Sequence, residues 1–201
     1  MAGLQVVTPP IHEPVDLVEM KEFLRVTGSA EDRLISRLIV EAREQFDGRY
    51  AWFNRALITQ TWKLSLDHFP LYCERPDVMW MRQFSIVVPL PPLQSVGSIQ
   101  YVDGDGNLQT LDPSLYVVDT QSEPGEIAPA YGTIWPVTRW QPNAVTVVFT
   151  AGYGAATKVP EEIKVWMKQV VAYRYDNRSL LTQLPSSFYW LMADYKTIWS
   201  V

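Results

Sequence analysis

The sequence predicts an α+β fold in which a discontinuous helical bundle carries an inserted antiparallel β subdomain and ends in an amphipathic C-terminal helix. Two observations carry this prediction: apolar residues recur at helical spacing near both ends of the 201-residue chain, and they alternate at strand spacing in between. Helices at both ends with strands between them favour one core that is interrupted in sequence. The expected parts are an extended N-terminal arm (1–14), core helices (15–55), the β subdomain (56–153), a core helix (154–179) and a C-terminal interaction tail (180–201).

The N-terminal part combines a proline-rich start with two helical patterns. Pro9, Pro10 and Pro14 favour an extended arm, because proline lacks a backbone donor and restricts the residue before it. Asp16 is suited to cap a helix over 17–25, and Ser29 is suited to cap a second, longer helix. The apolar stripe of that second helix consists of Leu34, Ile35, Leu38, Ile39, Ala42, Phe46 and Tyr50.

The middle of the chain has the period of two that is typical of strands. Alternation begins at Ile58 and continues to Leu66, with β-branched and aromatic residues enriched. Further strands are predicted over 78–88, 95–102, 108–111, 115–119 and 144–151. The segment Asp103-Gly-Asp-Gly-Asn107 predicts a hairpin turn whose glycines supply positive φ. Stretches rich in proline and glycine, such as 122–125 and 141–143, are predicted to be loops.

The helical pattern returns after Gly154. Pro160 and two following acids are typical of a helix start. The expected buried stripe of this helix consists of Ile163, Trp166, Met167, Val170, Val171 and Tyr173. After a connection over 179–185, a last helix is predicted with one aromatic and apolar side made of Phe188, Leu191, Met192, Tyr195 and Trp199. Such a terminal helix can dock on its own core or fit a groove on a neighbour.

The composition argues against several functions. The net charge of −5 and the scattered basic residues disfavour a surface that grips phosphate backbones. Cys73 is the only cysteine, and His12 and His68 lack metal-ligand spacing, so we expect no catalytic residue, no metal site and no cofactor. The turn at Asp103 departs from a calcium loop at its sixth and twelfth positions. Apolar runs are too short to cross a membrane, and we expect a soluble protein made inside the cell.

Two tryptophans are the candidates for ligand binding. Trp135 and Trp140 stand in an aromatic, proline-containing segment, and aromatic faces stack on sugars and on bases. In a chain with eight tryptophans, packing beneath a long loop is the commoner arrangement. A carbohydrate- or peptide-binding module that uses Trp135 and Trp140 is therefore the alternative function.

Several stretches in one order carry a resemblance to a known family. The chain resembles the phage head-to-tail connector proteins, also called adaptor or head completion proteins, including those of gene transfer agents. The matching stretches are Pro14–Val26, Arg55–Trp62, Pro89–Ser95, Ile99–Asp103, Phe149–Gly154, Val159–Ile163 and Tyr175–Arg178. Residues 70–80 and the aromatic tail from Phe188 depart from the family pattern.

The resemblance implies a non-enzymatic ring of twelve subunits. Such a ring docks under the portal, presents its other side to a stopper or tail-completion protein and lets double-stranded DNA pass through its centre. It implies a location at the capsid–tail junction of the virion, after assembly in the host cytoplasm, and no membrane contact. Together with the aromatic stripe, it also implies that the tail binds the portal. The expected portal-binding residues are Phe188, Tyr189, Trp190, Leu191, Met192, Tyr195 and Trp199.

Two hypotheses about the tail follow. Deleting residues 186–201 is expected to abolish portal binding while leaving the fold intact, because aromatic anchors dominate many interfaces. The tail is also expected to become ordered only on assembly, because a lone short helix is marginal in water.

Overall fold

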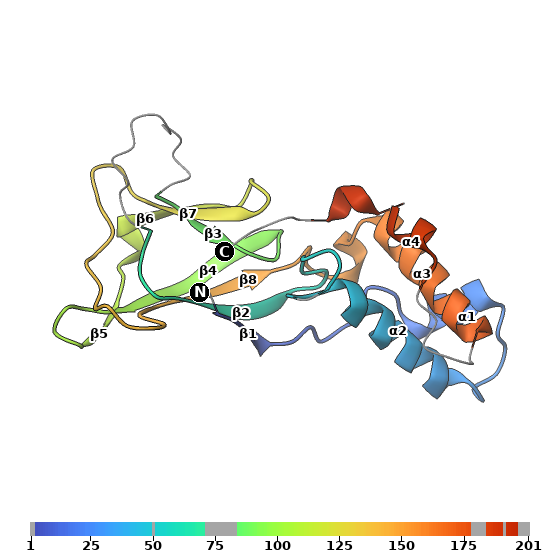
Figure 1. The fold of residues 1–201 in the computed structure, drawn as a ribbon. Helices are drawn as coiled ribbons and strands as arrows, with labels where there is room; N and C mark the ends of the chain where they lie inside the picture. Colours follow the sequence, from blue (N-terminus) through green and yellow to red (C-terminus); the bar gives the residue numbers. More distant parts are fainter. Residues whose placement is uncertain (1–2, 50, 71–83, 178–183, 191, 197–201) are drawn as a thin grey trace. The chain divides into compact units, whose positions relative to one another are not determined.

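The computed structural model describes residues 3–49, 51–70, 84–177, 184–190 and 192–196. Among them the chain forms two compact units (Figure 1). The β unit comprises residues 3–9 and 60–152, and the helical unit comprises residues 10–59 and 153–196. The chain therefore passes between the units after residues 9, 59 and 152. Both helices and antiparallel sheets are present, and the α+β class is confirmed.

The helical unit gathers helices from both ends of the chain. These helices are α1 (Leu17–Leu24), α2 (Asp32–Phe46), α3 (Glu161–Asp176) and the short α4 (Ser186–Trp190). Asp16 caps α1 as predicted, since its Oδ1 accepts a hydrogen bond of 2.8 Å from the backbone N–H of Glu19. No helix in the described ranges is long and apolar enough to span a membrane.

The predicted start of α2 at Ser29 is wrong. Residues before Asp32 form a turn in which the Ser29 carbonyl accepts from the Asp32 N–H at 3.3 Å. Glu31 takes the N-cap position, with no hydrogen bond from its side chain to the backbone of the helix. The turn thus replaces the expected first helical turn, and Tyr50, the last residue of the predicted stripe, lies outside the described residues.

The core of the helical unit lies between α2 and α3. The α2 residues Ile35, Leu38, Ile39, Ala42 and Phe46 are buried, as are the α3 residues Ile163, Trp166, Met167, Val170 and Val171. Phe46 meets Trp166 edge to face, with ring centroids 4.0 Å apart. Tyr173, the last residue of the expected α3 stripe, is only partly buried. Apart from that residue, the helical periodicity of α3 identified the face that packs against α2.

The β unit contains two antiparallel sheets. The first has the order β1-β2-β8-β4-β5, and the second has the order β3-β7-β6. The strands of the first are β1 (Gly3–Thr8), β2 (Gln60–Leu66), β8 (Val145–Ala151), β4 (Leu93–Val102) and β5 (Leu108–Thr110). Those of the second are β3 (Ile86–Val88), β7 (Gly125–Pro129) and β6 (Tyr116–Asp119). Strand β8 is central to the larger sheet and alternates between buried and partly buried residues.

The N-terminal segment does more than extend as an arm. Gly3–Thr8 pairs antiparallel with β2, so that Leu4 lies opposite Leu64 and Val6 opposite Trp62. The prolines that suggested an arm all follow this strand, where they do not remove ladder hydrogen bonds. Residues 3–8 are therefore an edge strand of the larger sheet.

Strand β7 was missed because proline and glycine suggested a loop there. It is bounded by Pro124 and Pro129 and begins at Gly125. The glycine is required by packing, since a Cβ added to it would lie 2.7 Å from the Cβ of Leu93. Of the predicted strand over 78–88, Ile86–Val88 is observed as β3, and 78–83 lies outside the described residues.

The predicted hairpin between β4 and β5 is confirmed, but only one of its two glycines, Gly106 and not Gly104, has a positive φ. Gly106 has a φ of 94°, and the Asp103 carboxylate accepts from the backbone N–H groups of Asp105 and Asn107 at 3.0 and 2.9 Å. A hydrogen bond from the Gln109 side chain, followed by the one from Asn107, lowers the pKa of Asp103. The acidic side chain is therefore used inside the turn.

The C-terminal region is not one continuous helix over its described residues. Helix α4 ends at Trp190, and a single 3-10 turn follows at Ala193–Tyr195. The Phe188 carbonyl accepts from the indole N–H of Trp166, and the Met192 N–H bonds to the Tyr189 carbonyl, three residues back. An α-helix would instead pair the Met192 N–H with the Phe188 carbonyl, so the α-helical hydrogen-bond pattern does not continue at Met192.

Candidate interaction surfaces

The C-terminal segment, residues 184–196, is held against the helical unit by its aromatic residues. The indole N–H of Trp166 donates to the Phe188 carbonyl at 2.8 Å. Gln45 donates to the Tyr189 hydroxyl at 3.1 Å, and the ring of Tyr189 lies 5.4 Å from that of Trp52. These contacts partly bury one side of α4, formed by Phe188 and Tyr189, on residues from α2, α3 and the segment that follows α2.

A second set of contacts fixes the segment near Tyr195. The Arg55 side chain donates to the Tyr195 carbonyl at 2.7 Å and to the Tyr153 hydroxyl at 2.6 Å. The Tyr195 hydroxyl donates to Glu162 at 2.6 Å. This bond to a carboxylate, aided by partial burial, raises the pKa of Tyr195 to about 12. Tyr195 is therefore neutral at physiological pH and held at both its backbone and its side chain.

The expected portal-binding residues divide by exposure. Met192 is buried, and Phe188, Tyr189 and Tyr195 are partly buried against the helical core. Trp190 is 79% exposed. The other two, Leu191 and Trp199, lie outside the described residues. Of the two arrangements that the sequence allowed, docking on its own core is the one that the described part of the tail adopts. This docked arrangement disagrees with the expectation that the tail becomes ordered only on assembly, and native-state hydrogen exchange of the single chain decides between the two.

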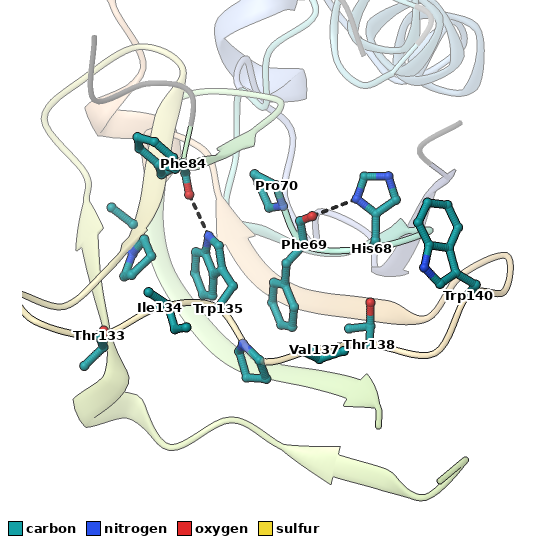
Figure 2. Close-up of a pocket in the computed structure, with 13 residues that line it drawn as sticks. His68, Phe69, Pro70, Phe84, Thr133, Ile134, Trp135, Val137, Thr138 and Trp140 are labelled. Carbon is teal, nitrogen blue, oxygen red and sulfur yellow. Dashed lines mark hydrogen bonds between the residues drawn. The ribbon is translucent and has the colours of Figure 1, made fainter. Parts of the chain in front are cut away.

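The β unit contains an apolar pocket of about 720 Å³ (Figure 2). Its wall includes a parallel stack of Phe69 and Trp135, whose ring centroids are 4.8 Å apart with 4° between the planes. The indole N–H of Trp135 donates to the Phe84 carbonyl at 2.6 Å. Trp135 thus has the packing role that the sequence suggested for a tryptophan beneath a long loop.

Trp140 lies at another part of the same pocket and is 86% exposed. Its ring centroid is 5.9 Å from that of His68, whose Nδ1 donates to the Phe69 carbonyl at 2.7 Å (Figure 2). The structure therefore separates the two candidate tryptophans: Trp135 is engaged in packing, while the face of Trp140 is open to a partner.

The loop between β7 and β8 carries an apolar surface that sequence reasoning missed. We define the apolar strip as Tyr131, Ile134, Val137 and Trp140, which recur at every third position and are 106%, 89%, 83% and 86% exposed. A signal for it was present in the sequence. Between Glu126 and Lys158, Arg139 is the only charged residue, although 19% of the whole chain is charged.

No metal centre is found in the described ranges, where no three His, Cys, Asp or Glu side chains are grouped to hold an ion. Asp103 accepts hydrogen bonds within its turn, and His68 contacts Phe69 and Trp140. Cys73 lies outside the described residues.

Comparison with known proteins was made by sequence and by structure. No family model matches the chain, and no curated protein has a matching sequence. Solved structures do match. A chain in the neck of an empty gene transfer agent particle, computed with C6 symmetry, has a TM-score of 0.75 and 19% identity, over 99% of this chain and 97% of that one. The two share a fold.

Two further structures agree with this match. A chain in the virion of a native gene transfer agent particle gives a TM-score of 0.70 at 19% identity, over 98% of this chain and 97% of that chain. A chain in the neck of a native particle, computed with C12 symmetry, gives 0.66 at 17% identity, over 99% and 97%. In each case the likeness extends over almost the whole of both chains.

Proposed function

We propose that this chain is a structural head-to-tail connector, or adaptor, of a tailed phage or a phage-like particle. The observation that carries the proposal is the match over 99% of the chain to a component of a gene transfer agent neck. The resemblance of the sequence to connector proteins rests on its own residues, such as 89–95 and 149–154, and supports the same role. In this role the protein acts through its shape and contacts, without enzymatic chemistry, at the capsid–tail junction.

The connector would act as a ring, for which we propose twelve copies. The matched necks were computed with C6 and C12 symmetry, and twelve copies fit both. A cyclic ring needs two different complementary patches on each subunit, because the contact between neighbours is head to tail. The ring would assemble in the host cytoplasm and become part of the virion.

DNA is proposed to pass through the ring without being gripped. A net charge of −5 with scattered basic residues suits such a conduit, because tight binding to a phosphate backbone draws on clustered lysine and arginine. On its two sides the ring would bind the portal protein and a stopper or tail-completion protein.

We propose that the portal contact is made through the C-terminal segment. Among the described residues of the segment, Trp190 is the proposed anchor, because covering an exposed tryptophan in an interface contributes a large share of the binding free energy. Leu191 and Trp199 remain in the proposed set. Phe188, Tyr189, Met192 and Tyr195 would reach the portal only if the segment left its own core, because their contacts are with the helical unit.

Because the segment is docked on the helical unit, deleting it is a poor test of portal binding. Deleting residues 186–201 would also remove buried Met192 from the helical core, so the deletion is no longer expected to leave the fold intact. A cleaner change is Trp190→Ala. Val18→Ala, at a residue of α1 that is 66% exposed, is the matched control.

Binding of each full-length variant to the assembled portal ring of the same particle would be measured by interferometry. Trp190→Ala is expected to weaken binding by about 2 kcal/mol, roughly 30-fold, while Val18→Ala binds like the parent chain. Equal binding by Trp190→Ala and the parent would refute the tail anchor. Failure of the parent chain to bind any portal would refute the connector itself.

The alternative proposal is a carbohydrate- or peptide-binding module, which the open face of Trp140 beside the apolar pocket favours. Titration of the chain with glycans and proline-rich peptides, followed by tryptophan fluorescence, tests it. A saturable spectral shift that disappears in Trp140→Ala would support the module, and an unchanged spectrum would count against it.

A further inference from the structure

The apolar strip is held in place by the rest of the β unit. At one end, the Thr133 hydroxyl lies 2.7 Å from the Ala130 carbonyl and 3.1 Å from the Leu115 carbonyl, and can donate to either. In the middle, Trp135 stacks on Phe69. At the other end, the Arg139 N–H donates to the Val102 carbonyl at 3.0 Å. A loop pinned at three points loses little further entropy on binding.

The loop also lacks the charged residues that are typical of a solvent-exposed surface. Arg139 is the only charged residue among positions 127–157. Depletion of charged residues, with aromatic residues enriched, distinguishes the centre of a protein interface from the rest of a protein surface. The strip has this composition, although it is fully open in the single chain.

The exposed area approaches what one side of an interface needs. Two nearly fully exposed aromatic residues, Tyr131 and Trp140, present roughly 300–450 Å². Ile134 and Val137 enlarge this area. The largest apolar patch on a typical monomer is about 300–600 Å², and a standard interface takes about 800 Å² from each partner. The strip can therefore provide much of one side of a stable contact.

We propose that the apolar strip is the surface by which each copy of this chain binds the next copy in a ring. The proposal rests on the connector function and names the partner of one surface. A second copy is favoured because the matched necks are cyclic assemblies, in which every subunit must cover a patch on its neighbour. The strip then meets a different patch of the next copy, as a head-to-tail contact requires.

The chemistry of the strip favours a protein partner over a sugar. Sugar hydroxyls are recognised by several convergent hydrogen-bonding groups, whereas the side chains of the strip carry polar atoms only on Tyr131 and Trp140. The side chains of Ile134 and Val137 have none. Apolar contact with another copy uses all four.

The first test is photo-crosslinking in assembled particles that carry Val137→benzoylphenylalanine. The expected product has twice the 23.0 kDa mass of the chain, and mass spectrometry places the second attachment point outside residues 130–140. A product with a stopper, portal or other protein overturns the inference, as does a strip-to-strip product, which indicates a two-fold contact. A yield no higher than without irradiation also overturns it.

The second test uses Val137→Asp and measures the protein concentration at which rings form by mass photometry. The protein concentration at which the variant forms rings should be at least roughly tenfold higher than for the parent, because a carboxylate would be buried without a partner in the contact. Assembly equal to that of the parent overturns the inference. The two proposals fail in different ways: absence of the chain from particle necks removes the connector function, whereas a crosslink to another neck protein removes only the strip assignment.

Discussion

Replacing Met192 with alanine tests whether the C-terminal segment is docked on the helical unit. Met192 is 4% exposed and belongs to the core of that unit. Truncating a buried methionine to alanine costs about 2–4 kcal/mol, through lost burial and the cavity left behind. The segment is short and lies at the edge of the unit, so it can open without unfolding α2 and α3. We therefore expect the free energy of local opening to fall by most of that amount.

The assay is native-state hydrogen exchange of the full chain, followed in peptides that cover residues 184–196. A loss of about 2–4 kcal/mol accelerates exchange roughly 30- to 700-fold, at 1.4 kcal/mol per factor of ten. The reporting amides include those of Phe188, Tyr195 and Lys196, which bond to carbonyls within the segment. The slowest amides of α3 should change less, because they report global unfolding.

Trp190→Ala is the matched control in the same segment. Its side chain is 79% exposed, and surface substitutions usually change stability by less than about 0.5 kcal/mol. Exchange in this variant should stay within roughly twofold of the parent. If the two variants accelerate exchange equally, or if neither does, the docked arrangement of Met192 is refuted.

Three further predictions concern stability. Asp16→Ala removes the cap of α1 and should lower the free energy of unfolding in urea by about 1 kcal/mol, and an unchanged urea midpoint would show that the cap contributes nothing. Gly125→Ala should cost about 1–3 kcal/mol in thermal unfolding, since the new Cβ would meet a packed side chain at 2.7 Å, whereas Gly104→Ala has open space and should unfold like the parent. The raised pKa of Tyr195 predicts that docking of the segment is intact below pH 10 and weakens as the pH rises to about 12, because the docked segment binds the hydroxyl proton more tightly than the undocked one. Tyr195→Phe lacks the hydrogen bond to Glu162 and should lose this pH dependence, measured by hydrogen exchange that is corrected for the intrinsic exchange rate.

The sequence predicted best where periodicity and local chemistry act together. The stripes of α2 and α3 pack as expected, because the same period of 3.6 that reveals a face also turns it toward one partner. Asp16 was identified as a cap because capping depends on residues only three apart. The hairpin at Asp103 was predicted for the same reason, since Gly106 and the Asp103 side chain determine the turn.

Features that depend on distant residues were missed. Strand β7 follows Pro124, and nothing local says that β3 and β6 pair on either side of it. The C-terminal segment has the spacing of one helix, but its α-helical bonding ends by Met192, and its Phe188 carbonyl accepts from the indole of Trp166, 22 residues earlier. Contacts with residues so far away in the sequence cannot be predicted from spacing.

The candidate surfaces were predicted in part. Trp140 was chosen because of its residue type, and the structure leaves its face open. Trp135 was chosen for the same reason, but its ring stacks on Phe69, which follows β2 and is far from Trp135 in the sequence. The low charge of residues 127–157 was available in the sequence and points to the apolar strip more directly than the tryptophans do.

The most direct test of the connector proposal is electron cryomicroscopy of the neck of the particle that contains this chain. We expect a closed ring of twelve copies at the portal vertex, with the apolar strip of each copy covered by its neighbour and Trp190 at the portal. Density for this chain elsewhere in the particle, or in an open arrangement without a ring, would contradict it.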